Sequence, residues 1–130
     1  MPELQTSAGR KKILIAEDES AILLSLEFLL QSEGHEVIIA EDGLEALRKA
    51  EETRPDLLVL DLMMPHADGF EVCRRIRASP SLREARILIL SARGREADIA
   101  RAYANGADDY MLKPFATQEF IAKVAALLAR

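Results

Sequence analysis

The 130-residue sequence has few of the residues that mark secreted, zinc-binding or membrane proteins. It contains a single cysteine, Cys73, and no tryptophan. One cysteine excludes an internal disulfide and a cysteine-rich zinc site, and it fits a reducing compartment. No apolar run approaches the length of a membrane span, and the first residues lack the apolar middle segment of a signal peptide. We therefore expect a cytoplasmic protein that does not bind a membrane.

Basic side chains are outnumbered as well. Lys and Arg total 17 against 22 Asp and Glu, which gives a net charge of −5. This balance argues against direct binding of nucleic acid by the chain. Apolar residues make up 49% of the sequence, enough for one core, and the length suits one domain. We expect a flexible N-terminal tail over residues 1–11 and one folded domain over residues 12–130.

Five short apolar runs recur along the chain, each followed by a polar break and a segment with helical periodicity. Because the runs are continuous rather than alternating, they are typical of strands buried on both faces of a parallel sheet. The runs lie at 13–16, 37–40, 57–60, 87–90 and 110–112, and the helical patterns at 22–30, 44–47, 70–76, 97–103 and 120–128. Asp42 with Glu45 suggests a capped helix start. This alternation predicts an α/β fold of the flavodoxin-like type, a five-stranded parallel sheet in the order 2-1-3-4-5 with five helices on both faces.

Chemically active side chains follow four of these runs directly. Glu17 and Asp18 follow the first, Asp61 the third, Ser91 the fourth and Lys113 the fifth. Ligands of open α/β sheets bind outside the carboxyl ends of the strands, so these side chains should share one crevice. Three crowded carboxylates either raise one another's pKa or hold a hard cation, for which oxygen ligands favour Mg²⁺. With an ammonium and a hydroxyl added, the set suits a phosphoryl group carried on a carboxylate. The alternative is that each acid simply begins a loop or caps a helix.

Four motifs carry a resemblance to a known family. They are ILIAEDE (13–19), LVLDLMMPHADGFE (58–71), ILILSA (87–92) and GADDYMLKPF (106–115). Together they resemble the receiver domain of response regulators in two-component signalling, over about residues 11–130. The C-terminal portion is most similar to receivers that precede winged-helix DNA-binding domains in transcription factors. The resemblance implies a phosphorylation-dependent switch, not an enzyme in the usual sense, that assists its own phosphorylation and dephosphorylation.

The resemblance also implies roles for the site residues. Asp61 resembles the phospho-acceptor, which takes its phosphoryl group from a sensor histidine kinase or a phosphotransfer protein. Glu17 and Asp18 resemble the acid pair that binds Mg²⁺ together with Asp61, and Met63 would add its backbone carbonyl. Ser91 fills the place of the hydroxyl residue that holds the phosphoryl group.

Lys113 resembles the phosphate-binding lysine, and its bond to Pro114 is expected to be cis. Tyr110 matches an aromatic switch that turns inward when Ser91 moves toward the phosphoryl group. That movement would change the face formed by the fourth helix, fifth strand and fifth helix. Related receivers form homodimers through this face. Here the residues that could supply ion pairs to it are Arg101, Asp108, Asp109, Glu119 and Lys123.

Two positions tune hydrolysis of the phosphoryl group in the family, two residues beyond the acceptor and two beyond the hydroxyl residue. They are Met63 and Arg93 here. Because a thioether is a weak hydrogen-bond acceptor, Met63 cannot orient a water strongly, and we expect slow self-dephosphorylation.

Two rival interpretations stay open: a metal-dependent hydrolase on the same sheet, and a degenerate receiver that only docks. Finally, we expect Arg74, Arg75 and Arg77 to form a solvated helix face.

Overall fold

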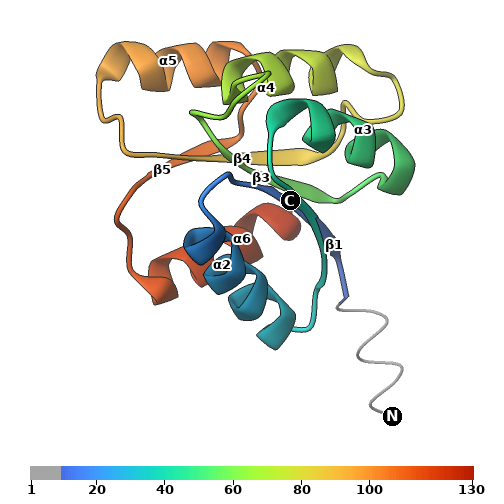
Figure 1. The fold of residues 1–130 in the computed structure, drawn as a ribbon, viewed down its shortest axis with the longest axis vertical. Helices are drawn as coiled ribbons and strands as arrows, with labels where there is room; N and C mark the ends of the chain where they lie inside the picture. The colour runs from blue at the N-terminus through green and yellow to red at the C-terminus, as the bar shows by residue number, and fades with distance from the viewer. Residues whose placement is uncertain (1–9) are drawn as a thin grey trace.

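The computed structural model describes residues 10–130, so most of the predicted tail lies outside the described residues. Strands and helices alternate along the whole described part (Figure 1). The elements are β1 (Lys12–Ala16), α2 (Ser20–Ser32), β2 (Glu36–Ala40), α3 (Gly43–Thr53), β3 (Leu57–Asp61), α4 (Gly69–Ala78), β4 (Arg86–Ser91), α5 (Glu96–Ala104), β5 (Asp109–Leu112) and α6 (Thr117–Leu128). None of the helices described is both long and apolar enough to cross a membrane.

All five strands pair in parallel, in the order β2-β1-β3-β4-β5. The predicted flavodoxin-like order is therefore confirmed. The central strand, β3, is buried at every position, as its uninterrupted run of Leu and Val predicts. The shortest strand, β5, lies at one edge of the sheet and β2 at the other.

Alternate side chains of each strand enter two separate cores. Leu58 and Leu60 of β3 belong to one apolar cluster with residues of α3, α4 and α5, whereas Leu57 and Val59 belong to a second with residues of α2 and α6. Figure 1 shows the same arrangement, with α3, α4 and α5 over one face of the sheet and α2 and α6 under the other. Because both faces are covered, polar side chains of the strands can meet solvent only where the strands end.

Side-chain caps set the starts of two helices, α3 and α4, that lie near residues 62–68. This segment follows the predicted phospho-acceptor Asp61, and we call it the acceptor loop. The Asp42 carboxylate accepts a hydrogen bond from the Glu45 amide at 2.8 Å, which confirms the predicted cap of α3. Asp68 caps α4 in the same way, accepting from the Glu71 amide at 2.9 Å. These bonds satisfy amides that the first helical turn leaves unpaired. They therefore fix the residues at which α3 and α4 begin.

The expectation of a solvated arginine face on α4 is wrong for one residue. Arg74 and Arg75 are exposed and pair with Glu71 at 2.6 and 2.7 Å. Arg77 is instead largely covered. Its guanidinium donates to the carbonyls of residues 83, 85 and 106 and forms a 2.8 Å ion pair with Asp108. Arg77 therefore ties the loop after α4 to the turn before β5.

Candidate functional site

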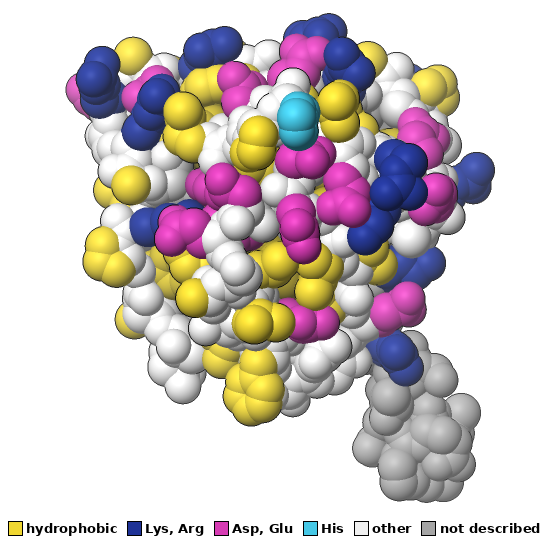
Figure 2. Space-filling view, viewed as in Figure 1, with side chains coloured by type: hydrophobic (Ala, Val, Ile, Leu, Met, Phe, Trp, Pro, Cys, Tyr) yellow, Lys and Arg dark blue, Asp and Glu magenta, His cyan; other side chains and the backbone are white. Residues whose placement is uncertain are grey.

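The three predicted carboxylates meet where β1 and β3 end. One oxygen from each of Glu17, Asp18 and Asp61 lies within 4.8 Å of the others. Glu17 is 1% exposed and Asp61 7% exposed, while Asp18 faces solvent. Adjacent parallel pairing of the two strands brings their ends to the same edge, since Ala16 of β1 pairs with Leu60 of β3. Figure 2 shows acidic side chains gathered across the middle of the visible face.

Lys113 reaches this group from the end of β5. Its ammonium lies 2.8 Å from Glu17 Oε1 and 3.4 Å from Asp61 Oδ1. The Lys113 amide donates to the Ser91 carbonyl at 2.8 Å, which extends the pairing of β4 with β5 beyond the strands. The peptide bond between Lys113 and Pro114 is cis, as predicted. The structure thus joins Glu17, Asp61 and Lys113 in one charged cluster.

Burial and crowding shift the ionisation of this cluster. Burial, followed by the negative charge of Glu17, raises the pKa of Asp61 from 3.8 to about 6, although the nearby ammonium of Lys113 acts in the opposite direction. Burial also lowers the pKa of Lys113, but its hydrogen bond to Glu17 and the charges of Asp61 and Glu17 outweigh this and hold that pKa above its ordinary value. One ammonium shared by two buried acids does not neutralise both. The cluster therefore retains an uncompensated negative charge.

These residues fit a divalent cation. The donors are carboxylate oxygens, with no histidine or cysteine among them, and this set favours Mg²⁺ over softer metals. A cation would also remove the charge repulsion that raises the pKa of Asp61. Asp18 and Asp61 with Glu17 would hold it. The predicted contribution of the Met63 backbone carbonyl stays a prediction.

The loop that carries Met63 is anchored at its base. The Leu62 amide donates to the Leu90 carbonyl at 2.9 Å, and the Leu62 carbonyl accepts from the Gly69 amide at 2.9 Å. A side chain at Gly69 would begin 3.0 Å from the Leu62 Cα atom, which explains why glycine suits this return point. Met63 follows directly and is half exposed. Main-chain bonds thus fix the base of the loop, one residue before Met63.

Ser91 and Tyr110 are joined through the loop after β4. Ser91 is buried, and its Oγ accepts a hydrogen bond from the Arg93 amide at 3.0 Å. The Tyr110 hydroxyl donates to the Arg93 carbonyl at 2.8 Å. The sequence predicted both end residues but not the link between them, because a backbone amide and carbonyl carry no signature of their own. The side chain of Arg93 points elsewhere, lying 3.7 Å from Asp98 on α5.

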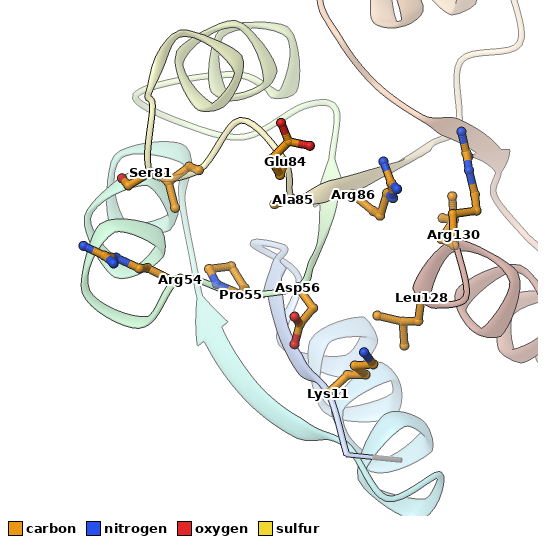
Figure 3. A pocket seen from close by; sticks show the side chains of 12 residues that line it. Lys11, Arg54, Pro55, Asp56, Ser81, Glu84, Ala85, Arg86, Leu128 and Arg130 are labelled. Carbon is orange, nitrogen blue, oxygen red and sulfur yellow. The ribbon is translucent and has the colours of Figure 1, made fainter. Parts of the chain in front are cut away.

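A separate cavity of about 250 Å³ lies at the opposite end of the sheet, at the amino ends of β1, β3 and β4 (Figure 3). Its apolar lining includes Pro55, Ala85 and Leu128, and its charged lining has both signs. Asp56 of this lining already accepts a hydrogen bond from the Lys12 amide at 2.8 Å. We call Glu17, Asp18 and Asp61 the carboxylate cluster. The cavity shares no residue with it, so the candidate site is the carboxylate cluster with the neighbouring Lys113.

Comparison with protein families agrees with this geometry. The family model described as "Response regulator receiver domain" matches residues 13–125. The chain belongs to the response regulator receiver domain family. Members of this family in two-component systems are phosphorylated on an aspartate, and the receiver resemblance and the signalling class predicted from the motifs are confirmed.

The similar curated proteins are transcriptional regulators. The chain is 47% identical over 120 residues to the alkaline phosphatase synthesis transcriptional regulatory protein PhoP of Bacillus subtilis, covering 92% of this chain and 49% of that protein. It is 45% identical over 119 residues to the phosphate regulon transcriptional regulatory protein PhoB of Rhizobium meliloti, covering 92% of this chain and 52% of that protein. The predicted likeness to receivers of transcription factors is thus confirmed. The chain spans about half the length of these relatives.

Solved structures give the same result for the fold. A chemotaxis protein of Vibrio cholerae matches with a TM-score of 0.86 and 30% identity, covering 91% of this chain and 98% of that one. The receiver domain of a sensor histidine kinase from Pseudomonas aeruginosa matches with a TM-score of 0.85 and 31% identity, covering 92% and 98%. That structure has a magnesium ion coordinated in its active-site cleft.

Proposed function

We propose that Asp61 is the phospho-acceptor of this receiver and takes a phosphoryl group from a phosphohistidine donor. The observation that carries the proposal is the convergence of three strand ends on one cluster, in which Asp61 lies beside two further acids and 3.4 Å from the Lys113 ammonium. A sensor histidine kinase or a phosphotransfer protein would present the donor. The proposal rests on this chain's own site geometry together with its family.

In the proposed step, an Asp61 carboxylate oxygen attacks the phosphorus of the donor. A new O–P bond forms as the N–P bond to the imidazole breaks, and the released ring nitrogen keeps the electron pair and takes up a proton. Bound Mg²⁺, held by Glu17, Asp18, Asp61 and the Met63 carbonyl, would offset the charge of the phosphoryl oxygens. The Lys113 ammonium would also offset that charge, and the Ser91 hydroxyl would donate a hydrogen bond to one phosphoryl oxygen.

Phosphorylation would then reach the surface through the Ser91–Arg93–Tyr110 link. A phosphoryl group adds about −1.5 to −2 charge and three acceptor oxygens. Ser91 gains a new partner, so the loop that carries the Arg93 amide and carbonyl shifts, and the hydrogen bond of Tyr110 shifts with it. The proposed output is a changed surface on α5, β5 and α6.

A homodimer through α5, β5 and α6 remains part of the proposal. Two of the predicted ion-pair residues already pair within the chain, since Lys123 lies 3.1 Å from Asp109. Arg101 lies 4.0 Å from the centre of the Phe70 ring. Dimer formation would therefore exchange internal contacts for contacts between copies. In sedimentation experiments we expect the phosphorylated native chain to be a dimer and the phosphorylated Lys123→Glu variant to be a monomer.

Incubation with a small phosphodonor and Mg²⁺ tests the central claim. Intact mass should rise by one phosphoryl group in the native chain and not in Asp61→Asn. Continuous turnover of free phosphoesters with no lasting mass gain would favour the hydrolase, and no gain at all would favour the docking module. Loss of phosphate should be slow, and Met63→Asn should accelerate it because an amide orients water better than a thioether does. An unchanged decay rate would defeat the Met63 argument alone.

A further inference from the structure

The sulfur-bearing side chains of the described residues differ sharply in their access to solvent. Met63 is 50% exposed, whereas Met64 is 9% and Met111 4% exposed. Cys73 is fully buried on α4, and burial raises the pKa of its thiol to about 12, so the reactive thiolate is absent near neutral pH. Among these residues, Met63 is therefore the one most accessible to a dissolved oxidant.

Met63 is also held next to the proposed phospho-acceptor. Two residues span at most about 7 Å of chain, and hydrogen bonds to both the amide and the carbonyl of Leu62 prevent the base of the loop from moving away from β3 and β4. Leu62 itself is fully buried in the core. The Met63 backbone is consequently kept within two residues of Asp61, and its side chain is exposed to solvent there.

We propose that Met63 is a reversible oxidation site through which peroxide shortens the lifetime of phosphorylated Asp61. The inference rests on the proposed function of Asp61. In the modification step the thioether sulfur attacks one peroxide oxygen, an S–O bond forms and the O–O bond breaks. The second oxygen leaves as water after taking up a proton, so the sulfur is oxidised by two electrons and the peroxide reduced by two. Methionine sulfoxide reductases with a thiol reductant reverse the step.

The consequence follows from hydrogen bonding. A thioether is a weak acceptor, whereas a sulfoxide oxygen is strongly polar. Oxidised Met63 can hold a water beside the phosphoryl group and aim it at the phosphorus. One hydrogen bond of ordinary net strength changes a rate by about five-fold, which is the acceleration of phosphate loss that we expect.

The test begins with site occupancy. The full chain is treated with hydrogen peroxide, and peptide mass spectrometry measures the gain of one oxygen at each methionine. Met63 should be oxidised before Met64 and Met111. Comparable oxidation of the two buried methionines would overturn the claim of selectivity, whether or not the chain accepts a phosphoryl group.

The second measurement is the lifetime of the phosphorylated chain. Peroxide should shorten it about five-fold in the native chain and in Met64→Leu, reductase treatment should restore it, and the lifetime of Met63→Leu should not respond to peroxide. Met63→Gln, a polar stand-in for the sulfoxide, should lose phosphate faster without peroxide. Full oxidation of Met63 with an unchanged lifetime would refute this inference and leave the proposed function intact. Failure of the untreated chain to gain a phosphoryl group would refute both.

Discussion

Replacing Asp61 with asparagine should make the metal-free protein more stable near neutral pH. A pKa raised from 3.8 to about 6 means that folding disfavours the ionised carboxylate by about 2 to 3 kcal/mol. Asparagine has nearly the shape of the protonated acid and carries no charge, so it avoids this cost. The Glu17–Lys113 hydrogen bond at 2.8 Å does not involve Asp61 and should persist.

The pH dependence gives the sign of the effect. Between the unfolded pKa of 3.8 and the folded value of about 6, the folded state binds more protons at Asp61 than the unfolded state does. The cost of the native aspartate is therefore fully present above pH 6 and disappears as the pH falls toward 3.8. The stability gain of Asp61→Asn should be greatest at about pH 7.5 and vanish at about pH 3.5.

Urea unfolding followed by circular dichroism, in the presence of a chelator, measures this difference at each pH. Mg²⁺ should then stabilise the native chain more than the variant, because the variant lacks one of the three carboxylate ligands. If Asp61→Asn were no more stable than the native chain at about pH 7.5, or more stable by the same amount at every pH, the claim that ionisation of Asp61 destabilises the folded state would be refuted.

Three further substitutions test other parts of the structure. Arg77→Met should destabilise the fold by about 2–4 kcal/mol in urea unfolding, because it removes a covered ion pair and leaves backbone carbonyls without donors. Lys113→Met should raise the pKa of Asp61 above 6, since the lost ammonium lowers it in the native chain, and carboxyl NMR titration without metal would detect the change. Gly43→Ala should destabilise by at least about 2 kcal/mol, because its new methyl group would lie 1.9 Å from a backbone oxygen of the acceptor loop.

Matched controls separate these effects from general damage. Arg75→Met removes an exposed ion pair from the same helix as Arg77 and should cost less than about 1 kcal/mol. Gly94→Ala brings its new methyl group no closer than 3.5 Å to a neighbouring side chain and should be nearly neutral. Equal losses for Arg77→Met and Arg75→Met would show that the covered network contributes nothing. If Gly43→Ala were as stable as the native chain, the acceptor loop would have to move aside without destabilising the fold.

The strands were predictable because a strand covered on both faces must be apolar at every position. The polar side chains then follow at the strand ends, so the apolar pattern alone places Asp61 and Ser91 at the ends of β3 and β4. The pattern did not predict which carboxylate pairs with the Lys113 ammonium. That pairing depends on distances between segments far apart in the sequence, 2.8 Å to Glu17 and 3.4 Å to Asp61. The pattern also missed the covering of Arg77, whose partners are mainly backbone carbonyls that any residue supplies. Side-chain periodicity predicts which apolar groups are buried, but it does not predict hydrogen bonds from a side chain to backbone carbonyls.

The two ends of the sheet carry different charge, and this affects how other molecules arrive. Carboxylates gather where β1 and β3 end. Around the cavity at the opposite end, four basic residues outnumber two acidic ones: Lys11, Arg54, Arg86 and Arg130 against Asp56 and Glu84. Such a dipole turns an approaching partner over roughly a Debye length, about 8–10 Å at moderate salt. A protein donor with a basic rim would be oriented toward the carboxylates before contact. A small free anion would be repelled, so its collision rate should rise with added salt while that of the basic partner falls.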